Sequence, residues 1–108
     1  MHKVLILFGP PVDQAAFARY FEQTHRPILD SLPHLGAIEV NWVAGSVTGD
    51  LPVHLLVELL FATEQALQDA LNSVAGQNMA RDYPSFASGG VTILLSNSAA
   101  IPTAGNQE

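Results

Sequence analysis

Residues 37–61 read AIEVNWVAGSVTGDLPVHLLVELLF, and this stretch decides the fold. In its first part, 37–47, apolar side chains alternate with Glu39 and Asn41, which is typical of a strand with two chemically different faces. The run Gly49-Asp50-Leu51-Pro52 predicts a turn, and the apolar run 53–61 predicts a second long strand. Two such strands around one turn favour an antiparallel hairpin.

The sequence on each side of this hairpin predicts one strand and one helical region. Residues 3–8 predict a buried strand that ends at Gly-Pro-Pro, and residues 91–95 predict the last strand. Asp13 can cap a helix that Pro27 should kink or restart, and Thr63 can cap a second helix, with a further helical piece after Ser73. The order β-α-β-β-α-β predicts an α+β, ferredoxin-like fold, in which a four-stranded antiparallel sheet carries its helices on one face.

The 108-residue chain carries few charges for its size. Only 13% of residues are charged and 48% are hydrophobic, against about 25% charged in an average soluble domain. The apolar runs are too short to span a membrane. The net charge is −6 and the Lys and Arg residues are scattered, so we expect no nucleic acid as a partner. The absence of cysteine excludes a disulfide framework. We also expect a cytoplasmic protein.

The low charge also predicts a partner for the sheet. The face without helices would carry Val, Leu and Ile, an apolar patch too large for a small monomer. We therefore expect a homodimer formed through this open sheet face. Residues 1–96 form one predicted domain. Residues 97–108 are rich in Ser, Ala, Pro, Gly and Asn and predict a flexible or partner-clasping tail.

Five short motifs follow one another between residues 3 and 96: Phe17-x-x-Tyr20-Phe21-x-x-x-His25-x-Pro27-Ile28, Leu32-Pro33-x-Leu35, Glu58-Leu59-x-Phe61, Ala70-Leu71-x-Ser73-x-x-Gly76-Gln77 and Phe86-Ala87-x-Gly89-Gly90-Val91. Their order and spacing resemble the EthD-like family, named for ethyl tert-butyl ether degradation, in the dimeric α/β barrel superfamily. The resemblance implies a homodimer whose two sheets face each other as a barrel, with one pocket per subunit. Superfamily members include cofactor-free monooxygenases, isomerases, polyketide cyclases, haem-degrading enzymes and proteins without an assigned activity.

His25 is the candidate catalytic residue. It follows the aromatic side of the first predicted helix and precedes Pro27, where a kink can direct a side chain into a cleft. An imidazole with an ordinary pKa near 6.5 suits acid/base catalysis at neutral pH. The alternative is structural: His25 hydrogen-bonds a backbone group that Pro27 leaves free.

Polar residues within the two long strands are further candidates. His54 and Glu58 are four residues apart, so we expect them on one sheet face, about 13 Å apart, with Glu39 and Asn41 opposite. Asn41 and His54 would orient a substrate oxygen, and Glu58 would act as a base or as partner to a histidine. The alternative is that Glu58 pairs across the dimer with Arg19, Arg26 or a histidine, because a buried charge needs a partner.

Aromatic and sulfur-containing side chains complete the predicted pocket. Its apolar substrate-binding residues are Tyr20, Phe21, Trp42, Met79 and Phe86. The alternative is that most of these are ordinary core residues. No His, Asp and Glu set has metal-ligand spacing, and no phosphate-binding glycine motif occurs. We therefore expect neither a metal nor an organic cofactor.

Three functions remain open from the sequence. The first is an enzyme, either an oxidoreductase of the monooxygenase type or an isomerase or cyclase, acting on a small hydrophobic or aromatic metabolite with His25 as acid and base. The second is a non-catalytic binding or accessory protein for an oxygenase-based degradation pathway. The third is a haem-binding protein with His25 or His54 as axial ligand.

Overall fold

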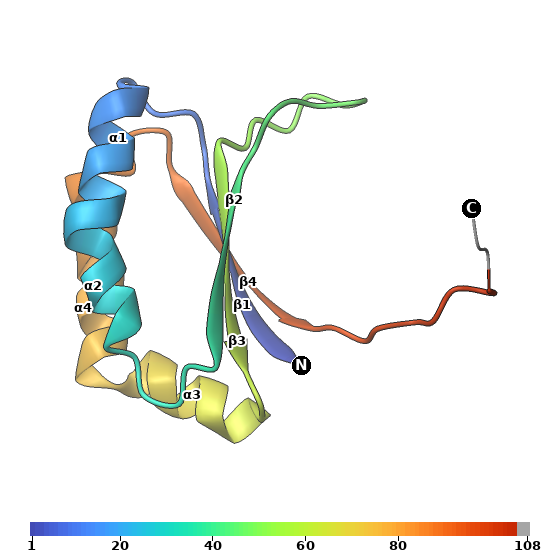
Figure 1. The fold of residues 1–108 in the computed structure, drawn as a ribbon. Helices are drawn as coiled ribbons and strands as arrows, with labels where there is room; N and C mark the ends of the chain where they lie inside the picture. Colours follow the sequence, from blue (N-terminus) through green and yellow to red (C-terminus); the bar gives the residue numbers. More distant parts are fainter. Residues whose placement is uncertain (106–108) are drawn as a thin grey trace.

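The structure, a computed structural model, describes residues 1–105. Its single antiparallel sheet has the order β2-β3-β1-β4, built from β1 (His2–Phe8), β2 (Ala37–Trp42), β3 (Leu55–Phe61) and β4 (Val91–Asn97). Strands β2 and β3 form the predicted hairpin, with Val40 opposite Val57. The hairpin therefore lies at one edge of the sheet, and β1 joins it to β4 at the other edge (Figure 1).

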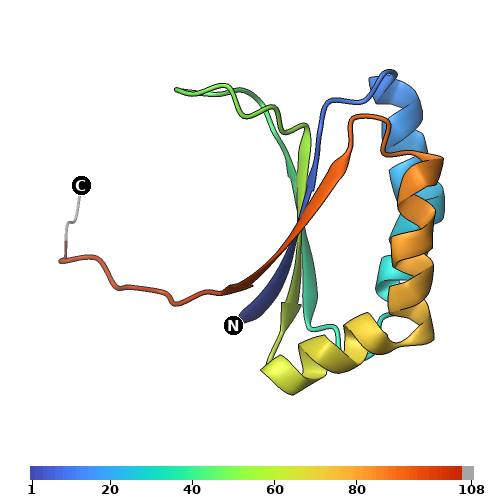
Figure 2. The ribbon, with the colours of Figure 1, turned by 180° about the vertical axis from the view of Figure 1, so that it is seen from behind.

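All helices lie on one face of this sheet (Figures 1 and 2). They are α1 (Gln14–Tyr20), the π turn η1 (Phe21–His25), α2 (Arg26–Asp30), α3 (Glu64–Asn72), α4 (Val74–Asp82) and the 3-10 turn η2 (Tyr83–Ser85). The side chains of Asp13, Thr63 and Ser73 cap α1, α3 and α4 by accepting hydrogen bonds from backbone N–H groups three residues later. The predicted ferredoxin-like α+β fold is confirmed.

The core lies between the sheet and the helices. Every second side chain of the two central strands points into it, because successive side chains of a strand face opposite ways. These residues are fully or almost fully buried: Val4, Ile6 and Phe8 of β1, and Leu55, Val57, Leu59 and Phe61 of β3. The helices contribute Phe17, Phe21, Leu29, Leu67, Ala70 and Met79.

The other side of the sheet has no helix over it, and we call it the open face (Figure 1). The intervening side chains of β1 and β3 point there, among them Leu5, Leu7, Leu56 and Leu60, together with Leu94 of β4. Leu94 is half exposed. The open face therefore carries the predicted leucines together with the polar side chains of Lys3, Asn41 and Glu58, whereas the Val and Ile residues of β1 and β3 point into the core.

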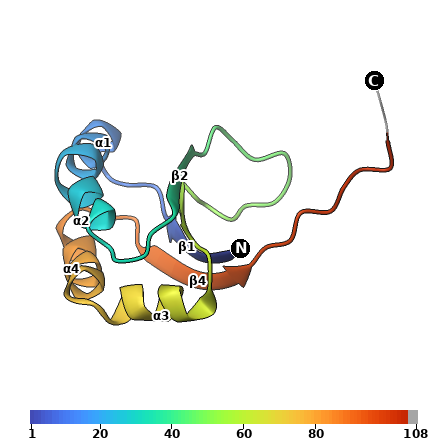
Figure 3. The ribbon, with the colours of Figure 1, turned by 60° about the horizontal axis from the view of Figure 1, so that its bottom comes forward.

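The hairpin strands are shorter than the sequence predicted. β2 ends at Trp42 and β3 begins at Leu55, so residues 43–54 leave the sheet as a loop. The last hairpin contact is the bond from the Val43 N–H to the His54 carbonyl, and the His54 N–H donates instead to Phe8 of β1. In the view of Figure 3, this loop and the segment 98–105 both project away from the helices.

The glycines at the end of β1 let two backbone segments meet. A Cβ placed on Gly89 would collide with the carbonyl oxygen of Pro10 and with the backbone of Gly9. The Gly9 N–H donates to the Gly90 carbonyl at this point. Within residues 1–105, no helix is long and apolar enough to cross a membrane.

Candidate functional site

His25 is the one polar residue among the described residues whose side chain is fully buried in the core. It ends the π turn, in which the Arg26 N–H donates to the carbonyl of Phe21, five residues earlier. Pro27 follows directly and has no N–H to donate. The sequence predicted that Pro27 kinks or restarts the helix. In the structure the helix stays continuous, and its type changes from the π turn to the α-helix α2 just before Pro27.

The π turn decides which side chains His25 meets. Tyr20 and His25 are five residues apart, and in a regular α-helix they would point about 140° apart. In a π turn the hydrogen bond itself spans five residues, so positions five apart come to the same side. Both side chains consequently reach one carboxylate, that of Asp82 at the end of α4.

Asp82 holds the two residues through its two oxygens. The Tyr20 hydroxyl donates to Oδ1 at 2.7 Å, and Nδ1 of His25 lies 2.8 Å from Oδ2. An ionised carboxylate only accepts hydrogen bonds, which assigns the proton of the neutral imidazole to Nδ1. Nε2 of His25 is then the acceptor nitrogen, and it is buried without a partner in the described residues.

Burial and Asp82 act in opposite directions on His25. Burial lowers the pKa of His25 below its usual 6.5, and this effect exceeds the rise caused by the Asp82 carboxylate. At neutral pH the imidazole is therefore a neutral base with a free lone pair on Nε2. The hydrogen bond to Asp82 raises the pKa of Tyr20, so this hydroxyl keeps its proton.

Aromatic rings surround the imidazole. The ring centroid of Phe86 lies 4.7 Å from that of His25, Tyr83 lies at 5.3 Å and Phe21 at 6.0 Å. Burial raises the pKa of Tyr83, whose hydroxyl also lacks a partner among the described residues. The surroundings of Nε2 are thus apolar, and both Nε2 and the Tyr83 hydroxyl are buried without a hydrogen-bond partner among the described residues.

A cavity of about 300 Å³ lies next to this cluster, between the start of α1 and the segment 84–88. Phe17, Tyr20 and Phe86 form its apolar wall, and Asp13 and Ser85 contribute to its rim. Tyr20 and Phe86 stack on each other with centroids 5.0 Å apart. Because Phe86 also contacts His25, one aromatic layer separates the cavity from the imidazole.

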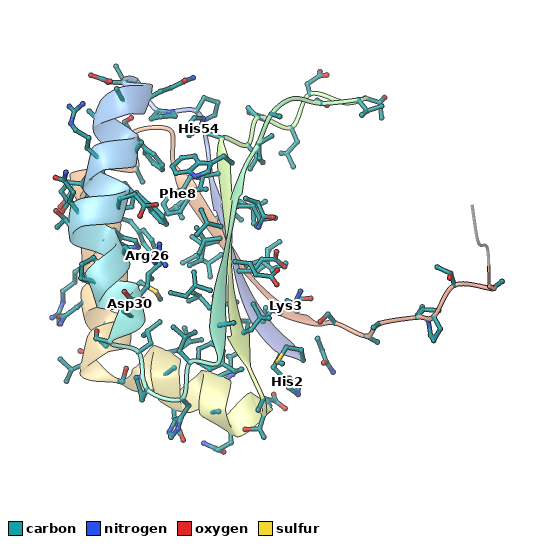
Figure 4. All side chains as sticks on the ribbon, viewed as in Figure 1. His2, Lys3, Phe8, Arg26, Asp30 and His54 are labelled. Carbon is teal, nitrogen blue, oxygen red and sulfur yellow. The ribbon has the colours of Figure 1, made fainter. Side chains whose placement is uncertain are left out.

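His54 lies in a different place from the one that the sequence predicted. It precedes β3 (Figure 4). Its ring packs on Phe17 and Trp42 at centroid distances of 5.4 and 5.7 Å. It is therefore on the helix side of the sheet. The predicted common face of His54 and Glu58 is wrong, because residue 54 leaves the strand and no longer follows its alternation.

Glu58 lies on the open face and has partners within its own chain. Its Oε1 accepts from Nζ of Lys3 at 3.0 Å, and its Oε2 accepts from the side-chain amide of Asn41 at 3.1 Å. Lys3 is the main cause of the lowered pKa of Glu58. Within its own chain, Glu58 is therefore paired with Lys3 of the neighbouring strand β1. The expected pairing with an arginine or histidine of a second copy stays a prediction.

The predicted pocket residues thus fall into three groups. Tyr20, Phe21 and Phe86 gather around His25, Trp42 packs with His54 beside Phe17 and Phe21, and Asn41 stays with Glu58 on the open face. Met79 belongs to none of these groups: it lies on α4 and is buried in the core. Residues 1–105 contain no group of three His, Asp or Glu side chains placed to hold a metal ion.

Asp82 was missed by reasoning from the sequence. It lies 57 residues from His25 along the chain, so no local spacing connects the two. The only available signal was its position at the end of a helix, directly before the Tyr83-Pro84 pair.

Comparisons with known proteins identify the family. A family model described as EthD domain matches residues 9–90. An uncharacterized 11.0 kDa protein from the thcB-thcC intergenic region of Rhodococcus erythropolis is 33% identical over 98 residues, which covers 90% of this chain and 94% of that protein.

Solved structures share the fold. An EthD family protein of Bacillus halodurans C-125 is 26% identical, with a TM-score of 0.84 over 92% of this chain and 99% of that one. A dimeric ferredoxin-like protein of unknown function from Jannaschia sp. CCS1 is 16% identical, with a TM-score of 0.65 over 91% of this chain and 100% of that one.

Proposed function

This chain belongs to the EthD family, and on that premise we propose that it is an enzyme in which His25 transfers a proton to and from a small apolar or aromatic substrate. One observation carries the proposal: the buried imidazole is held at Nδ1 by Asp82, while Nε2 has no partner and is surrounded by aromatic rings. A general base needs this combination of a fixed tautomer and a free lone pair.

The proposed step begins with an acidic C–H or O–H of the substrate. Its bond to hydrogen breaks, the proton forms a new bond to Nε2, and the electron pair stays on the substrate as an enolate or phenolate. Asp82 stabilises the imidazolium that results. In an isomerisation the same proton returns to a second carbon, so atoms and electrons balance without a cofactor. An oxygenation would start with the same deprotonation and would need O₂ as co-substrate: O₂ oxidises a CH₂ group of the substrate to C=O, one oxygen atom stays on the substrate and the other leaves as water.

We propose that the substrate occupies the cavity beside Tyr20 and Phe86. Its apolar wall suits an aromatic or aliphatic body, and the neutral imidazole suits a weakly acidic group that must lose a proton near neutral pH. Phe86 both lines the cavity and contacts His25. Rotation of the Phe86 ring would connect the cavity to Nε2.

We also propose that two copies associate through the open face. A folded monomer of this mass exposes about 5,800 Å², whereas this chain exposes 6747 Å². The excess of about 900 Å² includes the exposed segments 43–54 and 98–105 as well as the open face. It is of the same size as the roughly 800 Å² that each partner contributes to a standard interface. Sedimentation equilibrium at micromolar concentration tests this directly, and the mass of a single chain would contradict it.

Proton transfer can be tested before the natural substrate is known. We suggest 2-tetralone in D₂O, an aromatic ketone with acidic C–H groups, with C–H exchange followed by NMR and binding followed by the fluorescence of Trp42, the only tryptophan. The protein should accelerate exchange over buffer. His25→Gln should lower the acceleration by about 10²- to 10⁴-fold, and Asp82→Asn should lower it less.

The matched control is His34→Gln. His34 also pairs with an aspartate, but its side chain is exposed and its Nε2 lies 3.9 Å from Oδ2 of Asp69, farther than His25 lies from Asp82. This variant should exchange at the wild-type rate. Equal loss in both histidine variants would contradict the role of His25. Binding of 2-tetralone without accelerated exchange in the wild type would instead support the non-catalytic binding function. The complete burial of Nε2 also favours that function, because a buried nitrogen is shielded from a bound molecule.

A further inference from the structure

Two segments extend from the open-face side of the molecule (Figures 1 and 2). We call residues 43–54 the loop arm and residues 98–105 the tail arm. Apolar side chains on both are exposed: Val47 and Leu51 on the loop arm, and Ile101, at 86% exposure, on the tail arm. Exposed aliphatic side chains on extended arms lack the burial that normally stabilises such a conformation.

A hollow lies on the open face near the ends of β1 and β4 that are far from the tail arm. Its volume is about 400 Å³, and Leu7, Leu51, Pro52, Val91 and Leu94 supply most of its apolar wall. Leu7 and Thr92 pair across the two strands at this end. The hollow therefore combines part of the sheet with the base of the loop arm.

We propose that, in the homodimer, the tail arm of each copy crosses to the other copy and places Ile101 in its hollow. This inference rests on the homodimer proposed above. A two-fold axis that lies between the two sheets, parallel to them and perpendicular to the strands, brings the tail end of one sheet opposite the hollow end of the other. β4 carries both the start of the tail arm and a wall of the hollow, so the two features lie along the same edge of the sheet.

The length of the tail arm fits this crossing. Packed sheets lie about 10 Å apart. Ser98 still exchanges backbone hydrogen bonds with Met1, and the three residues from Ser98 to Ile101 span about 10 Å when extended. Ile101 therefore reaches the level of the partner sheet. Pro102 follows Ile101 and restricts it to extended conformations, which lowers the entropy lost on docking.

The chemistry of the two surfaces also agrees. Residues 91–105 contain no charged side chain, although they include an edge strand and an exposed segment. The residues that line the hollow are likewise uncharged. An uncharged arm that meets an uncharged hollow desolvates no ionised group, so apolar burial is not opposed by the cost of removing charge from water.

Cysteine cross-linking tests the contact cleanly, because the chain has no cysteine of its own. Ile101→Cys and Leu51→Cys are made in separate preparations, mixed and oxidised, and the linked peptides are identified by mass spectrometry. A bond between positions 101 and 51 can then form only between two copies. The control partner is Val74→Cys, which is 72% exposed but lies on α4 in the helix layer.

We expect the 101–51 disulfide to exceed the 101–74 disulfide by at least about tenfold. Equal yields, or an excess of 101–101 disulfide from tails that run side by side, would overturn the docking of Ile101 while leaving a dimer detected by sedimentation intact. A monomer in sedimentation would overturn both the docking and the dimer. Ile101→Asp should also raise the dimer Kd by at least about tenfold, a change of about 1.4 kcal/mol. The control Thr103→Asp adds the same charge to the tail arm and should raise the dimer Kd less.

Discussion

Replacement of Asp82 by Asn perturbs the centre of the candidate site with little change of shape. Asp82 accepts hydrogen bonds from Tyr20 and His25, and its side chain is only 13% exposed. An asparagine keeps only one oxygen acceptor. One of the two donors, Tyr20 or His25, therefore loses its acceptor, and the other exchanges a charged acceptor for a neutral one. A hydrogen bond to a charged group contributes about 1.5–3 kcal/mol. We expect Asp82→Asn to lower the free energy of unfolding by about 2 kcal/mol, or Tm by about 8–16 °C.

The same variant should change the titration of His25 in a defined direction. Burial lowers the pKa of His25, and Asp82 partly opposes this effect. Without the carboxylate, burial acts alone, so the pKa of His25 should fall further in Asp82→Asn. NMR titration of the imidazole signals measures this shift, and His25→Gln identifies the signal among the four histidines.

Asp69→Asn is the matched control for this variant. It removes an exposed carboxylate 3.9 Å from an exposed histidine, so it should change the stability by less than about 0.5 kcal/mol. An unchanged or raised pKa of His25 in Asp82→Asn would contradict the assigned role of Asp82. A stability of Asp82→Asn equal to that of Asp69→Asn would contradict it as well. The imidazole nitrogen shifts of the wild type should also place the proton on Nδ1.

Three further outcomes are expected. Because the pKa of His25 is lowered from 6.5 in the folded state, its contribution to stability is complete above about pH 6.5 and is lost as the pH falls through the folded pKa. Urea unfolding between pH 5 and 8 should therefore show a free energy of unfolding that falls as the pH is lowered. A free energy that stays constant or rises would count against a buried neutral imidazole. Gly89→Ala should cost about 1–3 kcal/mol through its collision with the adjacent backbone, whereas Gly45→Ala, where a Cβ meets nothing within 4 Å, should be nearly neutral by the same thermal unfolding assay. Lys3→Met should raise the pKa of Glu58, because Lys3 is the main cause of its depression; an unchanged carboxyl titration by NMR would contradict the ion pair.

The fold could be predicted because its determinants are local. The cap residues Asp13, Thr63 and Ser73 each act within three positions, and the alternation of buried side chains along β1 and β3 is a property of the strand itself. The order of these elements then left one plausible architecture. Family resemblance gave the same architecture from a separate set of motifs.

The site could be predicted only in part. His25 stood out beside Pro27, but Asp82 joins it across 57 residues, and such contacts arise from packing of helices that sequence patterns do not specify. His54 was misplaced because strand alternation was extended two residues beyond the point where the hairpin leaves the sheet. Lys3 was overlooked as a partner of Glu58 because β1 inserts between β3 and β4 and places Lys3 opposite Leu60, two positions from Glu58 on the same face of the sheet.

The π turn has a consequence for finding this site in other chains. A π turn is an α-helix with one residue inserted, so removal of an exposed residue such as Gln23 or Thr24 would restore a regular helix. Tyr20 and His25 would then be four positions apart, about 40° from each other around the axis, and both could still approach one carboxylate. A relative one residue shorter here could therefore keep the same trio. Searches should accept Tyr-x3-His as well as Tyr-x4-His, because the helix compensates for the difference in length.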